Sequence, residues 1–167
     1  MSAPVVAAFA SKISSFFKMG YYPSGSKNAA NGFNASGALL KAMLVHSGQK
    51  MKYIMNNTAG GEATVPYLDI SANDYPSDVQ GYGKIQMNKV LNFGDSSNAQ
   101  LSLFVVGSST PDQPHYAALH KDNNQNDTYT FLTPTSHRGG VRFTFAYTDL
   151  PGTSDTEVMQ NILTMKV

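Results

Sequence analysis

The residues that could carry out chemistry are few, and their spacing matches no self-contained catalytic site. The sequence contains no cysteine, which excludes a cysteine nucleophile, a thiolate zinc site and a disulfide framework. His115 and His120 lack the i, i+4 spacing and the glutamate of a helical zinc site, and no Gly-x-Ser-x-Gly elbow occurs. We interpret all four histidines as surface or packing residues, namely His46, His115, His120 and His137.

The acidic residues and the paired glycines predict turns. Asp69, Asp74 and Asp78 are irregularly spaced in a turn-rich region, so we assign no calcium or other metal to them. The pair at 60–61 is not followed by the Gly-Lys-Ser/Thr of a phosphate loop. Ser2 is interpreted as a packing or capping residue. The residues themselves therefore predict no catalytic, cofactor-binding or metal-binding site, and no cofactor.

Two helices are expected in the first half of the chain, and they would position any functional side chains there. Apolar residues recur three and four apart over residues 4–19, which is typical of an amphipathic helix, and Gly20 is expected to end it. A second stripe over residues 36–47 predicts another helix, which ends before Gly48 and places His46 where the helix dipole favours a cation. We expect irregular backbone over 54–70, a turn at 75–78 and a short helix at 88–93.

The pattern changes near Gly94, where we place a domain boundary at residues 94–98. Beyond it no helical period is found, and Gly, Pro, Asn and Asp separate short apolar or alternating runs. These runs predict strands of an antiparallel sandwich at residues 101–106, 116–120, 128–133, 141–147 and 162–167.

Composition excludes several classes of partner. The chain has 167 residues, with 12 basic and 11 acidic side chains, and no run approaches the about 20 apolar residues of a membrane-spanning helix. We therefore expect no general nucleic-acid binding and no membrane span. No basic segment precedes Val5 and Pro4 comes early, so no signal peptide is predicted. Acceptor sequons at Asn34, Asn56 and Asn126 favour a parent in the secretory pathway, while the compartment of this chain stays open.

Three segments of the first half resemble subtilisin-like serine proteases. Residues 1–8, Met-Ser-Ala-Pro followed by small apolar residues, are similar to the end of the Gly-Thr-Ser-Met-(Ala/Ser)-(Thr/Ala)-Pro motif that opens the helix of the nucleophilic serine. Residues 33–44 resemble the next helix, although His46-Ser47-Gly48 replaces the frequent Asn-Ser-Ala ending. Residues 80–85, Gln-Gly-Tyr-Gly-Lys-Ile, together with Tyr75-Pro76 and Val90-Leu91, resemble the Gln-Gly-(Trp/Tyr)-Gly-Arg-Val segment that closes the catalytic domain.

The second half is similar to the β-sandwich that many large subtilases carry after the catalytic domain. Residues 146–152 occupy the place of its Trp-Thr-Asp-Pro-Pro-Gly turn, and residues 161–167 that of its Asn-Asp-Leu-Asp-Leu strand. Ile162 and Thr164 replace the two acidic positions of that strand, which weakens any calcium or charge-pair role there. The resemblance implies an α/β remnant at residues 1–93, formed by the C-terminal helices of a subtilisin-like catalytic domain. An incomplete antiparallel, jelly-roll-like sandwich would follow at residues 94–167.

The family mechanism uses an Asp-His-Ser triad and an oxyanion-hole Asn. Alignment at Met1 implies that the nucleophilic serine would immediately precede this chain, with the other three residues further upstream. The chain is thus expected to be a partial serine endopeptidase, inactive alone, whose parent acts on protein or peptide substrates.

The resemblance also has a consequence for packing. In the family, the first helix packs against a parallel sheet from upstream sequence, so we expect Phe9, Ile13 and Phe16 to be exposed, the first half to be marginally stable, and the helix or a sandwich edge to allow self-association. One alternative is a non-catalytic interaction module, a degenerate protease copy that docks to a partner. A weaker one is a carbohydrate-binding or adhesive sandwich, for which Tyr116, Tyr129 and Tyr147 are equally well explained as core residues.

Overall fold

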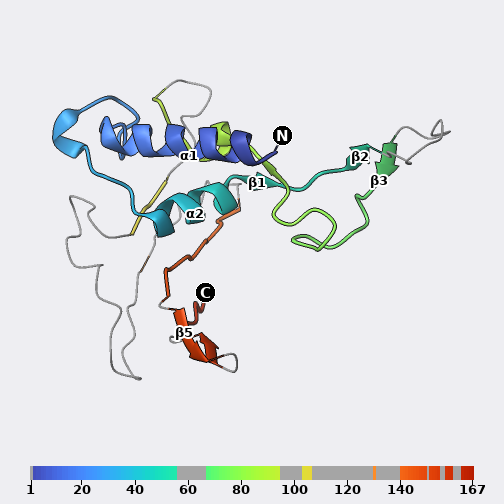
Figure 1. The fold of residues 1–167 in the computed structure, drawn as a ribbon. Helices are drawn as coiled ribbons and strands as arrows, with labels where there is room; N and C mark the ends of the chain where they lie inside the picture. The colour runs from blue at the N-terminus through green and yellow to red at the C-terminus, as the bar shows by residue number, and fades with distance from the viewer. Residues whose placement is uncertain are drawn as a thin grey trace.

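The computed structural model describes residues 2–55, 67–94, 103–106, 130, 140–149, 151–154, 157–159 and 163–167. Within these residues the helices are α1 (Ser2–Lys18) and α2 (Gly37–His46), with short 3-10 helices η1 (Ala29–Asn31) and η2 (Met87–Lys89). Antiparallel pairs join β1 (Gly48–Gln49) to β4 (Lys84–Ile85), β2 (Tyr53–Met55) to β3 (Tyr67–Asp69), and β5 (Pro151–Ser154) to β6 (Glu157–Met159). Figure 1 shows α1 lying over α2, with β2 and β3 extending to one side.

The first predicted helix is confirmed as α1, within two residues at its start and one at its end. Gly20 ends it as expected, with a positive φ of 73°. Its N–H donates to the Phe17 carbonyl at 3.0 Å, and its own carbonyl accepts from the N–H of Asn28 at 3.1 Å. A Cβ at this position would lie 1.7 Å from the Asn28 carbonyl oxygen. Glycine is therefore required both by the left-handed backbone and by the loop that closes over it.

The second predicted helix is confirmed as α2, and its ends are capped by side chains. The Ser36 hydroxyl accepts a hydrogen bond from the Leu39 N–H at 3.2 Å, which satisfies one of the free donors of the first turn. At the other end, the Ser47 hydroxyl donates to the Leu44 carbonyl at 2.7 Å. α2 packs against α1, and the apolar faces of the two helices meet.

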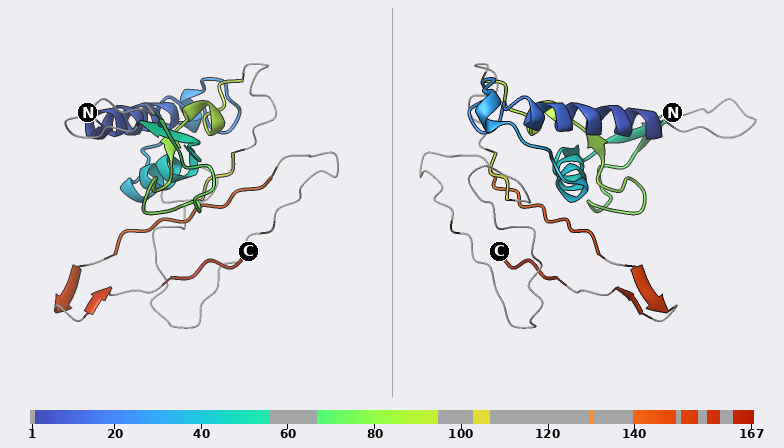
Figure 2. Two further views of the ribbon diagram at one scale, coloured as in Figure 1. Left: turned by 90° about the vertical axis from the view of Figure 1, so that its right-hand side faces the viewer. Right: turned by 60° about the vertical axis from the view of Figure 1, so that its left-hand side comes forward.

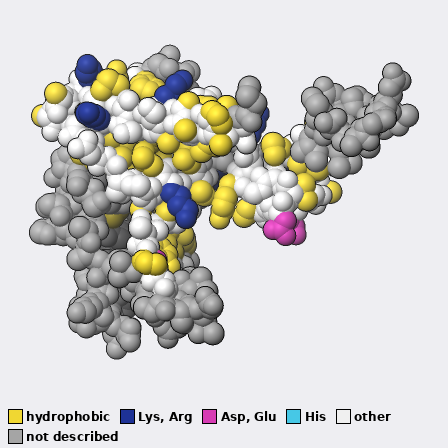
Figure 3. All heavy atoms as spheres, viewed as in Figure 1, with side chains coloured by type: hydrophobic (Ala, Val, Ile, Leu, Met, Phe, Trp, Pro, Cys, Tyr) yellow, Lys and Arg dark blue, Asp and Glu magenta, His cyan; other side chains and the backbone are white. Residues whose placement is uncertain are grey.

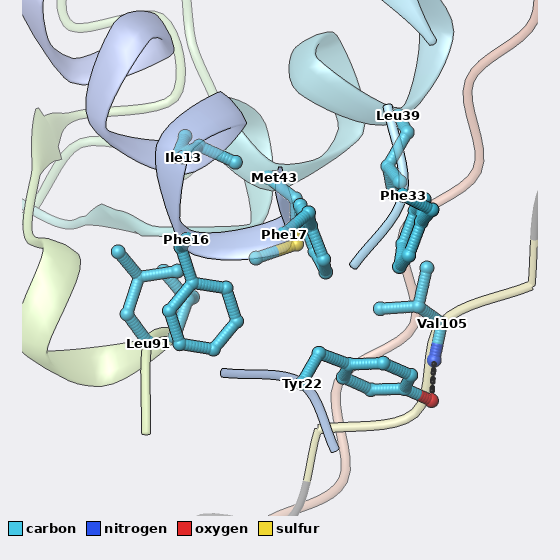
Figure 4. Close-up of a cluster of buried hydrophobic side chains, with 10 residues drawn as sticks. Ile13, Phe16, Phe17, Tyr22, Phe33, Leu39, Met43, Leu91 and Val105 are labelled. Carbon is cyan, nitrogen blue, oxygen red and sulfur yellow. Dashed lines mark hydrogen bonds between the residues drawn. The ribbon is translucent and has the colours of Figure 1, made fainter. Parts of the chain in front are cut away.

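The core lies between the helices and the loops that follow them. Figure 4 shows Phe17 between Phe16 on one side and Phe33 on the other, with ring centroids 5.3 and 4.9 Å from that of Phe17. The buried cluster comprises Ile13, Phe16, Phe17, Tyr22, Phe33, Leu39, Met43, Val90, Leu91 and Val105.

This core corrects the expectation that Ile13 and Phe16 are exposed. Their side chains are only 0% and 2% exposed, because the chain's own later segments cover the second half of α1. Burying each contributes about 1.5–3 kcal/mol, so the first half is less dependent on an outside partner than the resemblance implied. The beginning of α1 differs: Val5 and Val6 are 51% and 39% exposed, and Phe9 is half-buried.

Two local predictions in the first half are wrong. The helix predicted at 88–93 is the 3-10 turn η2, because Val90 leaves the helical region of backbone space and turns into the core with Leu91. The irregular region predicted at 54–70 includes strand residues at both ends, where β2 and β3 pair. That pairing joins residues more than ten positions apart, so local periodicity carries no signal for it.

Beyond residue 94 the described residues give a partial view of the second predicted domain. Val105 belongs to the same core as the helices, and its N–H donates to the Tyr22 hydroxyl at 3.2 Å. Residues 103–106, 140–149 and 163–167, which fall in or around predicted strands, are not in strands. The β5–β6 hairpin lies where no strand was predicted, away from the helices in Figure 2. The runs at 116–120 and 128–133 lie outside the described residues except for Thr130, and the sandwich stays a prediction.

Candidate functional site

The N-terminus of α1 is the place to which the family resemblance assigns chemistry. The helix begins at Ser2, and Pro4 lies in its first turn, where a missing N–H costs no hydrogen bond. The residues from Ser2 to Ala8 are all exposed, so Ser2 does not pack into the core, and the alternative of a capping role stays a prediction. Met1, beside which the nucleophile would stand, lies outside the described residues. The free N–H groups of a first helical turn favour negative charge placed at that end.

The closing motif at residues 80–85 folds back onto the end of α2. Gly48 pairs with Ile85 and Gln49 with Lys84 in the β1–β4 ladder. The Gln80 carboxamide oxygen accepts a hydrogen bond from the Met51 N–H at 2.8 Å. The segment at 80–85 thus lies against residues 48–51, just beyond the end of α2.

Tyr75 and Gly83 complete this junction. The Tyr75 hydroxyl lies 2.9 Å from the Gly48 carbonyl oxygen and 3.0 Å from that of Tyr82, and so ties the turn to β1. Gly83 has a φ of 71°, and a Cβ there would lie 2.0 Å from the Gln49 carbonyl oxygen. The sequence motif therefore contains glycine at this position because another backbone segment passes against it.

His46, at the last position of α2, contacts residues that no sequence signal placed near it. Its Nδ1 lies 2.8 Å from the Thr144 Oγ1, 98 residues further along the chain. The Arg142 guanidinium donates to the carbonyl oxygens of His46 and Gly48 at 2.7 and 2.9 Å. Burial, and secondly the positive charge of Arg142, lower the pKa of His46 below its usual value. The cation expected at this end of the helix is therefore the guanidinium of Arg142. The lowered pKa favours the neutral form of His46.

The His46–Thr144 pair is not arranged as a catalytic dyad. A triad histidine is oriented by a carboxylate that stabilises the imidazolium, whereas the charged neighbour that shifts the pKa of His46 is the cation Arg142. Within the described residues, His46 is a half-buried side chain with a polar partner. The other histidines, His115, His120 and His137, lie outside the described residues.

An apolar groove runs along α1 on the side that faces η2. It encloses about 390 Å³ and is continuous with the half-buried Phe9. Figure 3 shows hydrophobic side chains gathered over part of the face viewed in Figure 1, with a few Lys and Arg side chains among them. Apolar side chains dominate its wall, among them Phe9, Phe16, Met19, Met87, Leu91 and Phe93.

Asp69 ends β3 and makes a side-chain contact with the turn that follows it. The Asp69 carboxylate accepts a hydrogen bond from the Ser71 N–H at 2.8 Å, and hydrogen bonds from Ser71 lower the pKa of Asp69. Among the described residues, no group of three or more His, Asp or Glu side chains is arranged to bind a metal ion. Of the sequons, Asn34 is exposed, while Asn56 and Asn126 lie outside the described residues.

Comparisons with protein-family models, with curated proteins and with solved structures found no match. None of the helices among the described residues is both long enough and apolar enough to cross a bilayer.

Proposed function

We propose that this chain is the part of a subtilisin-like serine endopeptidase that follows the nucleophilic serine and continues into a C-terminal β-sandwich. The observation that carries the proposal is the order of three motifs, at residues 1–8, 33–44 and 80–85. The parent enzyme hydrolyses peptide bonds in protein or peptide substrates.

The arrangement of these motifs supports the proposal. The first opens a helix, the second forms α2, and the third pairs with the strand that directly follows α2. The exposed Val5 and Val6 also fit a helix whose first turns pack against further sequence. The positions of the three motifs and the exposure of Val5 and Val6 are those that the proposed catalytic domain requires. The motifs are well separated in the sequence.

In this role the chain supplies a platform for the nucleophile. A serine next to the start of α1 would lie at free N–H groups and at the positive end of the helix dipole, which favour the developing oxyanion. Ile13, Phe16 and Phe17 anchor the other end of α1 in the core. A rigid anchor keeps the helix N-terminus in place, and catalytic geometry is sensitive to displacements of about 1 Å.

The proposal is tested by labelling the native gene product with a fluorophosphonate probe and mapping the adduct by peptide mass spectrometry. We expect the adduct on a serine directly preceding Met1, with Asp and His motifs upstream of it. The matched control is the 167-residue chain produced alone, which should neither take up the probe nor hydrolyse casein. A native product without Gly-Thr-Ser before Met1, or labelling of the chain alone, would contradict the proposal.

The apolar groove on α1 and the exposed Val5 and Val6 favour a second candidate, a non-catalytic interaction module. In that case the native product would lack the triad motifs and would co-purify with a partner at fixed stoichiometry. A monodisperse monomer that melts cooperatively would count against it.

A further inference from the structure

Residues 140–149 are attached to the C-terminal end of α2 by side-chain hydrogen bonds. Arg142 donates to two backbone carbonyls there, and Thr144 pairs with the His46 ring. Figure 1 shows the segment starting beside the end of α2 and running away from it toward β5. Since the first predicted domain ends at 93, these contacts connect its helical part to the second part of the chain.

Arg142 acts as a cap for α2. The last carbonyls of a helix have no partner within the helix and form the negative end of its dipole, where a cation is stabilising. The Arg142 guanidinium contacts the carbonyl of His46, the last residue of α2, and that of Gly48 just beyond it. The hydroxyl of Tyr75 shares the Gly48 carbonyl.

The surroundings of His46 disfavour a second positive charge. Its ring is half-buried beside Arg142, and both effects lower its pKa. The Tyr75 hydroxyl donates to the Gly48 carbonyl at this junction, and Lys41, Tyr82 and Tyr147 line a hollow of about 210 Å³ together with Thr144. Residues 1–55 contain six lysines and no Asp or Glu, and the acidic residue of the docked segment is Asp149 at its C-terminal end.

We propose that His46, Arg142 and Thr144 form a pH-sensitive latch, which holds residues 140–149 on α2 while His46 is neutral and releases them when His46 is protonated. Protonation places an imidazolium next to the Arg142 guanidinium and requires a half-buried charge to be solvated. Because the pKa of His46 is lowered on docking, the contribution of the latch is fully present above the ordinary pKa of about 6.5 and is lost as the pH falls through the lowered value. The latch does not depend on protease activity.

The absence of cysteine allows a direct test in the full chain. Cysteines introduced by Asn34→Cys and Thr148→Cys, both at exposed positions, would carry spin labels for distance measurement between pH 8 and pH 5. We expect one narrow distance distribution at pH 8 and a broad, longer one at pH 5. The midpoint should lie below pH 6.5, while far-UV circular dichroism shows that the helices persist.

The matched control is His46→Asn, which keeps a side chain able to bond Thr144 but does not titrate. Its distribution should stay narrow at both pH values, whereas Arg142→Gln should be broad even at pH 8. The latch is contradicted if the wild-type distance does not change, if His46→Asn responds like wild type, or if the helices melt with the same midpoint. Should His46→Asn fail to fold, the wild-type titration decides alone, because a release midpoint at or above 6.5 contradicts the latch.

Discussion

Two glycines lie where a side chain would meet another stretch of backbone. Gly20 was predicted to end a helix, and its positive φ and its contact with Asn28 confirm this. Gly83 was recognised only as part of a motif, because the backbone of Gln49 that crowds it lies 34 positions earlier. A stop signal is a local property of the chain, whereas a close approach between two backbones depends on the fold.

Substituting Gly83 tests this close approach, with Gly81 as a matched control. Both have positive φ, but a Cβ at Gly81 meets nothing within 4 Å. Gly81→Ala should cost about 1–2 kcal/mol from backbone strain alone. Gly83→Ala should cost about 1–3 kcal/mol more, because the Gln49 carbonyl must move. Urea unfolding followed by circular dichroism gives both values, and equal losses would show that the predicted clash is relieved without cost.

At the scale of elements, the two α-helices were predictable and the strand pairs were not. The apolar stripe of α1, the Ser36 cap of α2 and the glycines at their ends are all local signals. The β1–β4 ladder pairs Gly48 with Ile85, so it depends on chain segments brought together by the core. The predicted strand at 141–147 has no ladder partner within the described residues, and its polar side chains instead bond the end of α2.

The cap of α2 can be tested by Ser36→Ala. Loss of the hydroxyl leaves the Leu39 N–H without its acceptor and should reduce the free energy of unfolding by about 1 kcal/mol. Ser11→Ala, at an exposed position inside α1, serves as the control and should be neutral or stabilise by about 0.5 kcal/mol, because alanine favours helix. Thermal unfolding of the unglycosylated protein measures both. An unchanged stability of Ser36→Ala would mean that water replaces the hydroxyl without cost.

At the scale of the whole molecule, one core is assembled from α1, α2, the loops after them and Val105. This core buries the second half of α1 and leaves its first turns and the groove beside them uncovered. Apolar surface of this kind promotes association. The charges are unevenly distributed along the chain despite the net charge of +1, because all 11 acidic residues follow residue 55.

We therefore predict that the chain self-associates through the start of α1. The double substitution Val5→Ser and Val6→Ser should lower the weight-average mass measured by sedimentation velocity at a fixed concentration. Val79→Ser changes a side chain of similar exposure elsewhere, 53% against 51% for Val5, and should leave the mass unchanged. A wild-type chain that is monomeric at every concentration measured would contradict this prediction.

The sequence by itself determined the two helices, the glycine that ends the first of them and the order of the motifs from which a subtilisin-like role is proposed. These depend on the periodicity and chemistry of neighbouring residues, which are present before the chain folds. Only the tertiary structure decided that Ile13 and Phe16 are buried, that the motif at 80–85 lies against the end of α2, and that His46 has Arg142 as its neighbour. These contacts join residues tens of positions apart, and their energy arises only when packing excludes water from between them.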